Sequence, residues 1–128
     1  MELELLQRCR EPLQRAVKLD PDNKLGALAE ASLNLIVLDL PEDTTAAYTR
    51  LKQYIEQYPE GENAIKARYY MAVTLYAQGG VNNFKSALEI LKPLTIIKPE
   101  DPYYKNRWVT EAAALEVLIR EDLAGDRQ

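Results

Sequence analysis

Residues 84–99 of the chain read FKSALEILKPLTIIKP, and small, large and proline residues follow one another here at a regular spacing. Ala87, Leu91, Leu94 and Pro99 are separated by four, three and five residues. The same spacing recurs upstream at Ala47, Leu51, Tyr54 and Pro59, and again at Cys9, Leu13, Ala16 and Pro21. The three copies lie 38 and 40 residues apart. An internal repeat of this period indicates a stacked array.

Each part of this pattern has a physical role in a pair of packed helices. The small residue lets two helices approach closely, and the larger residues four and seven positions later fill the seam between them. The proline ends the helix, because the residue before a proline disfavours helical geometry. Stacked hairpins then bury a continuous core that a single hairpin cannot bury. The alternative is an irregular helical bundle in which prolines end helices by coincidence.

Helical spacing of apolar residues continues through almost the whole chain, and no segment has the strict alternation of a half-buried strand. Turn-forming residues interrupt the pattern at five places, which divides the chain into about six helices. The predicted helices span residues 3–19, 24–39, 43–58, 62–78, 83–98 and 102–123. The sequence therefore predicts a single all-α domain.

Acids and prolines mark where several of these helices begin or bend. Asp43 or Thr44 is expected to cap the third helix, and Pro102 fits the first turn of the sixth. Pro12 and Pro93 fall inside helical patterns, where proline removes a backbone hydrogen bond and clashes with the preceding turn. We expect kinks at both prolines, with a shorter first helix beginning at Pro12 as the alternative.

Three segments resemble the tetratricopeptide repeat family, whose repeats are helical hairpins. Residues 16–23, AVKLDPDN, are similar to the end of that family's second helix and the start of the next repeat. Its first helix is similar to Met71, Ala72, Leu75 and Tyr76 followed by Gly79, and its second to Phe84, Ala87, Leu91 and Pro99. The resemblance implies a right-handed α-solenoid of antiparallel helix hairpins. Residues 1–128 divide into a partial repeat at 1–23, a degenerate repeat at 24–61, the best-matching repeat at 62–101, and a capping helix and tail at 102–128.

The chain departs from the family pattern in the degenerate repeat at 24–61 and in the best-matching repeat at 62–101. The turn at 79–83 is longer than the family's, which implies an exposed loop with Val81 at its tip. Leu94 and Tyr54 stand where the family prefers a small residue, which implies wider packing at those seams. The helix at 24–39 lacks the family's bulky, small and aromatic set, so the register of that repeat stays open.

In this family the first helices of successive repeats line a concave groove, which the resemblance places at residues 24–39, 62–78 and 102–123. On the middle helix one face, at three- and four-residue spacing, carries Lys66, Tyr69, Val73, Tyr76 and Ala77. The opposite, core-directed side carries Met71, Ala72 and Leu75. Tyrosines on a groove wall are typical anchors for a protein partner.

The residue types on this face favour one kind of ligand. The best-known groove of the family binds the terminal carboxylate of chaperone tails through Lys, Asn and Arg side chains. Tyr69 and Val73 occupy positions where such a clamp needs a basic residue and an amide. We therefore expect an internal peptide or helix, recognised by its side chains. The alternative for Tyr69 and Tyr76 is packing against neighbouring helices with only their hydroxyls in water.

The last predicted helix resembles the helix that closes such arrays and presents a polar outer face to solvent. Its apolar stripe consists of Trp108, Ala112, Leu115 and Ile119. Trp108, Val109 and Leu118 are the candidates for association of this end with a second copy or a following repeat. Tyr103 and Tyr104 are expected to pack at the start of the helix.

The composition excludes several classes of function. The chain has 128 residues, a formal net charge of -4 and no histidine. It lacks the clustered Lys and Arg that neutralise phosphates, so we expect no nucleic-acid partner. Because the chain has no histidine, it lacks the usual general base at neutral pH and the commonest metal ligand. Capping explains the paired acids at helix ends, so we expect no catalytic residue among them. The sequence has neither a phosphate-binding loop nor the spacing of metal ligands. We therefore expect no cofactor and no metal.

The N-terminus and the most apolar segment bear on location. The opening MELELLQRCR has acids where an export signal has basic residues. This argues against the envelope-assembly lipoproteins of bacteria, whose repeats are similar to YPEGENA at 58–64. Residues 25–40 are interrupted by polar residues and are too short for a membrane span. Cys9 is expected to be a small buried apolar residue. A lone thiol is compatible with a reducing compartment, and with no export signal we expect a cytoplasmic protein. A start inside a helical pattern is compatible with an excerpt of a longer chain.

Together these features predict a non-enzymatic adaptor that binds a partner peptide or helix in the groove. The alternative is a structural or self-associating subdomain that forms homodimers through its terminal helices. Protection of Tyr69 and Tyr76 by a partner peptide would favour the adaptor, and concentration-dependent dimerisation would favour the subdomain.

Overall fold

The computed structural model describes residue 8 and residues 10–126, and these residues form helices joined by turns and loops, without strands. The helices are α2 (Arg10–Leu19), α3 (Ala27–Asp39), α4 (Thr44–Gln57), α5 (Glu62–Gln78), α6 (Val81–Thr95) and α7 (Arg107–Asp126). The predicted all-α fold with about six helices is confirmed for this part of the chain. The predicted burial of Cys9 and the part of the predicted first helix at residues 3–7 lie outside the described residues.

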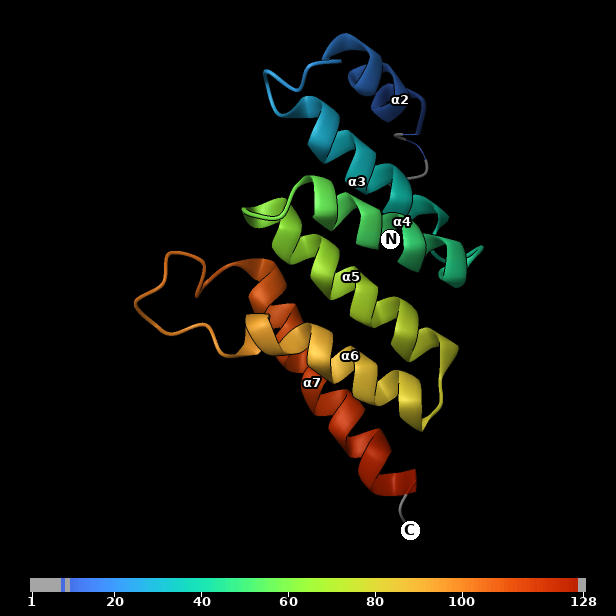
Figure 1. Cartoon of the computed structure of the whole chain (residues 1–128), viewed down its shortest axis with the longest axis vertical. Coiled ribbons are helices and arrows are strands. Elements are labelled where there is room, and N and C mark those ends of the chain that lie inside the picture. The colour runs from blue at the N-terminus through green and yellow to red at the C-terminus, as the bar shows by residue number, and fades with distance from the viewer. Residues whose placement is uncertain (1–7, 9, 127–128) are drawn as a thin grey trace.

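The helices succeed one another along the long axis of the molecule, from α2 at one end to α7 at the other (Figure 1). Each helix packs against the next one in the chain. In addition α3 packs against α5, and α5 against α7, whereas α2, α4 and α6 make no such contacts with one another over residues 10–126. Alternate helices therefore lie closer together in the set α3, α5 and α7 than in the set α2, α4 and α6.

Two clusters of buried apolar residues hold the helices together, and α5 contributes to both. One cluster joins α3, α4 and α5, and it includes Leu33 and Met71. The other joins α5, α6 and α7, and it includes Leu75, Leu91 and Ile119. Because α5 is buried on two sides, its apolar residues are distributed around the helix instead of along one stripe.

The repeated small and large residues mark the buried side of α4 and α6. The buried positions are Ala47, Leu51 and Tyr54 in α4, and Ala87, Leu91 and Leu94 in α6. In α2 the corresponding Leu13 and Ala16 are only half-buried. The difference arises because α3 is the one helix that packs against α2 in the described part of the chain.

A buried aspartate organises the turn between α2 and α3. The carboxylate of Asp20 accepts hydrogen bonds from the backbone N–H groups of Lys24, Leu25 and Ala27 at 2.8, 3.0 and 3.0 Å. The side chain of Asn23, whose φ is 56°, accepts a further bond from the first turn of α3. These bonds hold residues 20–26 in a turn, so α3 begins at Ala27 and not at the predicted residue 24.

The turn between α5 and α6 is shorter than predicted. Gly79 and Gly80 have φ angles of 79° and 94°, which glycine adopts without steric cost, and α6 begins immediately afterwards at Val81. The side-chain nitrogen of Asn83 donates to the carbonyl oxygen of Gly79 at 2.8 Å, which satisfies an acceptor at the end of α5. The prediction of a loop at 79–83 with Val81 at its tip is therefore wrong, although the Val81 side chain is exposed.

The segment before α7 is longer than predicted. The helix begins at residue 107, not at 102, so Pro102 lies in a loop instead of a first helical turn. Asn106 ends this loop, because its side-chain oxygen accepts from the backbone N–H of Trp108 at 2.8 Å. Tyr103 and Tyr104 are exposed on the loop and do not pack at the helix start as predicted. Figure 1 shows the loop projecting from the side of the molecule.

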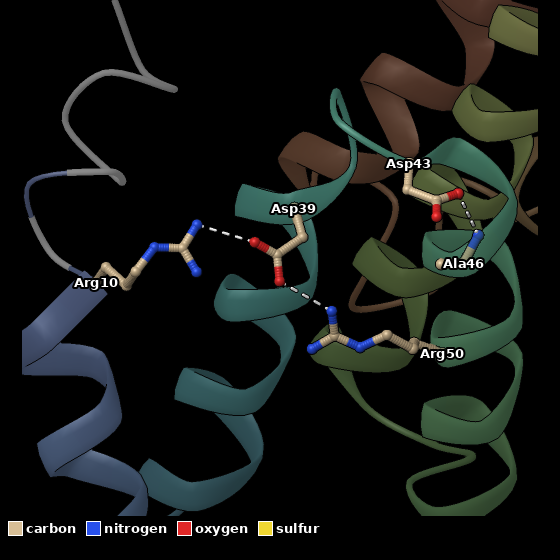
Figure 2. Close-up of polar contacts among 5 residues, drawn as sticks. All are labelled: Arg10, Asp39, Asp43, Ala46 and Arg50. Atoms are coloured by element: carbon tan, nitrogen blue, oxygen red, sulfur yellow. Dashed lines mark hydrogen bonds and ion pairs between the residues drawn. The ribbon is translucent and has the colours of Figure 1, made fainter.

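The other predictions about caps and prolines have mixed outcomes. Asp43 caps α4 as predicted, since its side chain accepts from the backbone N–H of Ala46 at 3.0 Å (Figure 2). Pro93 lies inside α6. Pro12 lies in α2, two residues after Arg10, and Arg8 is helical as well. A kink at Pro12 and a first helix that begins at this proline both stay predictions. A kink at Pro93 stays a prediction.

Asp39, the last residue of α3, joins three helices. Its carboxylate accepts from Arg10 of α2 and from Arg50 of α4, each at 2.9 Å (Figure 2). Burial alone would raise the pKa of Asp39, but the hydrogen bonds and positive charges of both arginines outweigh it and lower the pKa below its ordinary value of 3.8. The contact between α2 and the rest of the molecule thus has an electrostatic component.

Candidate functional site

The predicted groove face of α5 is partly covered by other helices. Its members Lys66, Tyr69, Val73 and Tyr76 are half-buried, and Ala77 is exposed. The predicted core-directed residues Met71, Ala72 and Leu75 are buried, which confirms the prediction for that side of α5. The predicted groove face is not an open surface, because Tyr69, Val73 and Tyr76 pack against a core cluster.

Trp108, at the start of α7, packs against aromatic residues of α5. Its ring centroid lies 5.6 Å from that of Tyr69 and 5.4 Å from that of Tyr70. The two tyrosine rings lie 5.0 Å apart in an edge-on arrangement. Aromatic pairs at these separations contribute beyond the area that they bury, so this cluster fixes the start of α7 against α5.

Lys66 connects the series of helices α3, α5 and α7. Its Nζ donates to the side-chain oxygen of Asn34 on α3 at 2.6 Å. The same nitrogen lies 5.0 Å from the ring centroid of Trp108, and the guanidinium carbon of Arg107 lies 4.6 Å from that centroid. Both cations are at cation–π distance from the indole ring.

Tyr76, near the end of α5, also makes contacts within the chain. Its ring centroid lies 5.3 Å from that of Phe84 on α6, and its hydroxyl donates to the carboxylate of Asp122 on α7. The hydrogen bond to Asp122, together with burial and the negative charge of that carboxylate, raises the pKa of Tyr76 above its ordinary value of 10.0. The structure therefore places Tyr69 and Tyr76 against neighbouring helices, as the packing alternative predicts.

A groove of about 500 Å³ opens where α3, α5 and α7 begin, and we call it the acid-lined groove. Its apolar and aromatic lining includes Leu25, Ala29, Tyr58 and Trp108. Its polar lining includes Asn23, Glu30, Glu60, Glu62, Asn63 and Lys66. The three glutamates are exposed, so their carboxylates are accessible to a ligand.

Lys66 is one of the predicted partner-binding residues, and in the structure it lines the same groove as Trp108 and three glutamates. The glutamates were missed because Glu30 and Glu62 lie in the first turns of α3 and α5, where acids ordinarily stabilise a helix start. A usable signal was their common position at the start of alternate helices. Helices that run in the same direction bring their first turns to the same edge of the molecule.

The predicted end-face residues have different environments. Trp108 and Val109 are buried in the core cluster of α5, α6 and α7, because the start of α7 is covered by α5. Leu118 is 42% exposed, and its neighbour Val117 is 56% exposed. A groove of about 710 Å³ lies between α6 and α7, with Leu88, Ile96 and Arg120 in its lining. The apolar surface available at this end is therefore further along α7 than the first turn.

Tyr54 is the third group with a shifted pKa, and it is structural. Its hydroxyl donates to the carbonyl oxygen of Ala29 on α3 at 2.7 Å. Burial raises the pKa of Tyr54 to about 12, with a smaller contribution from the nearby Tyr58. Neither Tyr54 nor Asp39 lines the acid-lined groove.

Within residues 8 and 10–126, no group of three or more Asp, Glu or Cys side chains is placed to hold a metal ion. No described helix combines the length and the apolar character needed to cross a membrane. Comparison with known protein families, with curated proteins and with solved structures gives no match for the chain.

Proposed function

We propose that the chain is a non-enzymatic protein-interaction module, a right-handed α-solenoid of tetratricopeptide-like hairpins that binds a peptide or helix of a partner protein along α3, α5 and α7. The alternation of helix contacts carries this proposal. The helices α3, α5 and α7 contact one another in series, whereas α2, α4 and α6 do not in the described residues. Stacked hairpins with a constant rotation between repeats bring the helices of the concave side together and splay those of the convex side.

The surface along α3, α5 and α7 supports a ligand-binding role. Asn34 of α3 and Lys66 of α5 contribute half-buried polar groups to this surface, and the acid-lined groove, which Lys66 also lines, opens where the three helices begin. Ala77 leaves an exposed, small position near the end of α5. A surface of this kind offers separate apolar, cationic and anionic contacts to the side chains of an extended or helical segment.

The environment of the titratable groups supports a role without catalysis. The shifted pKa values of Asp39 and Tyr54 have structural causes, since Asp39 pairs with two arginines and Tyr54 is buried with its hydroxyl bonded to a backbone carbonyl. Tyr76 bonds to Asp122 between α5 and α7. A general acid or base is instead expected in a cleft, where it exchanges its proton with the substrate.

The proposal is tested with peptides selected on the wild-type chain from a random peptide library. An Asn34→Arg, Ala77→Arg variant places two bulky charges on α3 and α5, and we expect it to bind the selected peptides about tenfold more weakly or not at all. An Ala46→Arg, Gln53→Arg variant carries the same added charge on exposed positions of α4 and should bind like the wild type. Circular dichroism checks that both variants remain helical.

Chemical-shift mapping on the wild-type chain provides a second readout that does not depend on the variants. Peptide binding should shift amide resonances of α3, α5 and α7. Shifts confined to α2, α4 or α6, or equal loss of binding in the two variants, would show that the partner surface lies elsewhere.

Self-association is a second candidate function, favoured by the exposure of Val117 and Leu118 on α7. In this case the mean mass measured by light scattering should rise with concentration toward that of a dimer. A Leu118→Lys variant should remain monomeric, whereas Val81→Lys, a matched change at an exposed apolar position of α6, should behave like the wild type. A wild-type chain that stays monomeric at all concentrations tested rules this candidate out.

A further inference from the structure

The acid-lined groove carries an excess of negative charge. The carboxylates of Glu30, Glu60 and Glu62 line it, together with the ammonium group of Lys66. The guanidinium of Arg107 lies 4.6 Å from the ring of Trp108, which also lines the groove, so three carboxylates face two cations. Lys66 is held by the side chain of Asn34 and lies over the ring of Trp108. Since the three carboxylates come from two separate segments of the chain, the charge at this place is a product of the fold.

Helix capping accounts for only part of this arrangement. Glu30 and Glu62 lie in the first turns of α3 and α5, where the helix dipole favours a negative charge. Glu60 lies before Gly61, the N-cap residue of α5, and is outside the helix. Its exposed carboxylate nonetheless joins the other two at the groove.

An exposed apolar side chain lies beside these acids. Leu25 lines the groove and is 88% exposed, in the turn whose backbone Asp20 holds in place. Tyr58 lines the groove as well, and its ring packs at 4.9 Å from that of Tyr54, which fixes it in position. Lys and Arg side chains suit such a surface, because their aliphatic stems cover apolar groups while their charged ends reach the surrounding acids.

We propose that the acid-lined groove is the docking site for a basic segment of a partner protein, with aliphatic stems on Leu25 and Tyr58 and cationic ends among the three glutamates. The complementarity of charge between this groove and a Lys- or Arg-bearing segment selects that occupant over a neutral or acidic one. The inference rests on the proposed function, because it names the chemistry of the partner that binds along α3, α5 and α7.

Three peptides of equal length test the inference: alternating Leu and Lys, alternating Leu and Gln, and alternating Leu and Glu. Binding is measured by fluorescence anisotropy with the wild-type chain. A Glu30→Gln, Glu60→Gln, Glu62→Gln variant removes the charges of the groove. A Glu42→Gln, Glu56→Gln, Glu89→Gln variant removes the same number of charges from exposed positions outside it.

We expect the Leu–Lys peptide to bind the wild-type chain about tenfold more tightly than the Leu–Gln peptide, and more weakly as salt is raised. The groove variant should lose at least about fivefold in affinity for the Leu–Lys peptide, and the control variant less than about twofold. Amide resonances of the turn at residues 20–26 and of residues 58–66 should shift when the peptide binds.

Equal losses in the two variants would overturn the inference, because they would reflect attraction to an acidic surface in general. Tighter binding of the Leu–Gln or Leu–Glu peptide, with shifts along α3, α5 and α7, would also overturn it while leaving the proposed function in place. If none of the peptides shifts the groove resonances, the basic-segment inference fails, and the library selection decides the proposed function independently.

Discussion

Tyr54 ties α4 to α3 through one buried hydroxyl group. The hydroxyl donates to the carbonyl oxygen of Ala29 at 2.7 Å, and the side chain is buried. The resemblance to tetratricopeptide repeats marked this position as one that prefers a small residue. The large side chain can be buried here because its hydroxyl finds a hydrogen-bond acceptor, the carbonyl oxygen of Ala29.

Replacing Tyr54 by Phe should lower the free energy of unfolding at neutral pH by about 1 kcal/mol, because it removes a buried hydrogen bond while keeping most of the packing. The raised pKa adds a pH dependence. The folded chain holds the Tyr54 proton more tightly than the unfolded chain, so this stabilisation is complete below pH 10.0 and is lost as the pH rises toward about 12. Urea titrations at a series of alkaline pH values measure both effects.

The control for Tyr54 is Tyr103→Phe, which changes a tyrosine exposed on the loop before α7. This variant should keep the alkaline loss of stability, and Tyr54→Phe should reduce it. An alkaline profile that is the same in Tyr54→Phe as in the wild type contradicts the assignment.

Asp39 should make folding sensitive to acid. Its lowered pKa means that the two arginine contacts stabilise the folded chain above pH 3.8, and that this contribution is lost as the pH falls through the lower, folded-state value. The side chain is 34% exposed, so solvent screens the pairs and the Asp39→Asn variant should lose only about 1 kcal/mol at pH 7. Thermal unfolding at pH 7 and at acidic pH checks both the loss and its pH dependence.

Asp43→Asn is the matched control for Asp39, and both residues appear in Figure 2. Asparagine retains the oxygen that accepts from the N–H of Ala46, so the cap of α4 is kept while one carboxylate is removed. If Asp43→Asn destabilises the chain as much as Asp39→Asn, the arginine contacts of Asp39 do not have the assigned role.

At the scale of elements, the ends of the helices depend on a few polar side chains. Asp20 holds the turn before α3, Asn106 begins α7, and Asn83 closes the turn after α5. The sequence indicated turns at all of these places, but the predicted starts of α3, α6 and α7 were each misplaced by two to five residues. Asn82 and Asn83 have low helix propensity, so the segment resembled a loop although the glycines before it had already completed the turn.

Asp20→Ala should destabilise the chain by about 2 kcal/mol, because three backbone N–H groups at the start of α3 lose their acceptor. Asp20→Asn should be intermediate, since it keeps one carbonyl oxygen. Asp22→Ala, at an exposed position of the same turn, should have little effect. Equilibrium unfolding in urea ranks the three variants, and equal stability of Asp20→Ala and Asp22→Ala would contradict the role of Asp20.

At the scale of the whole molecule, the two core clusters share α5, whereas α2 contributes no buried residue. A helix with few buried apolar contacts opens at a lower free energy than one packed on both sides. The molecule therefore has a gradient of local stability from α5 toward α2. The ion pair of Arg10 with Asp39 is one of the contacts that oppose the opening of α2.

Native-state hydrogen exchange should reveal this gradient. Amides of α2 should exchange through local opening, well before those of α5, which should exchange only with global unfolding. Asp39→Asn should accelerate exchange in α2 and leave α5 close to the wild type once the global stability is taken into account. Equal protection of α2 and α5 would show that the chain unfolds as one unit.

The candidate site illustrates where prediction from the sequence stops. The face of α5 with Lys66, Tyr69 and Tyr76 followed from helical spacing. Tyr69 is partly covered by Trp108, and Tyr76 is partly covered through its contact with Asp122. Both partners lie on α7, so helical spacing within α5 could not reveal these contacts. The acid-lined groove was missed because Glu30 and Glu60 are far apart in the chain and meet only when α3 and α5 pack together.

The amino-acid sequence was enough to predict the helical class, the approximate positions of the helices, the buried sides of α4 and α6, and the burial of Met71, Ala72 and Leu75 on α5. These properties depend on spacing within one helix, and helix geometry converts spacing into a face. The packing of the helices was needed to show which exposed residues gather into a groove and which tyrosines are covered. Those properties depend on contacts between helices, and a contact between residues distant in the chain leaves no mark in the spacing of either segment.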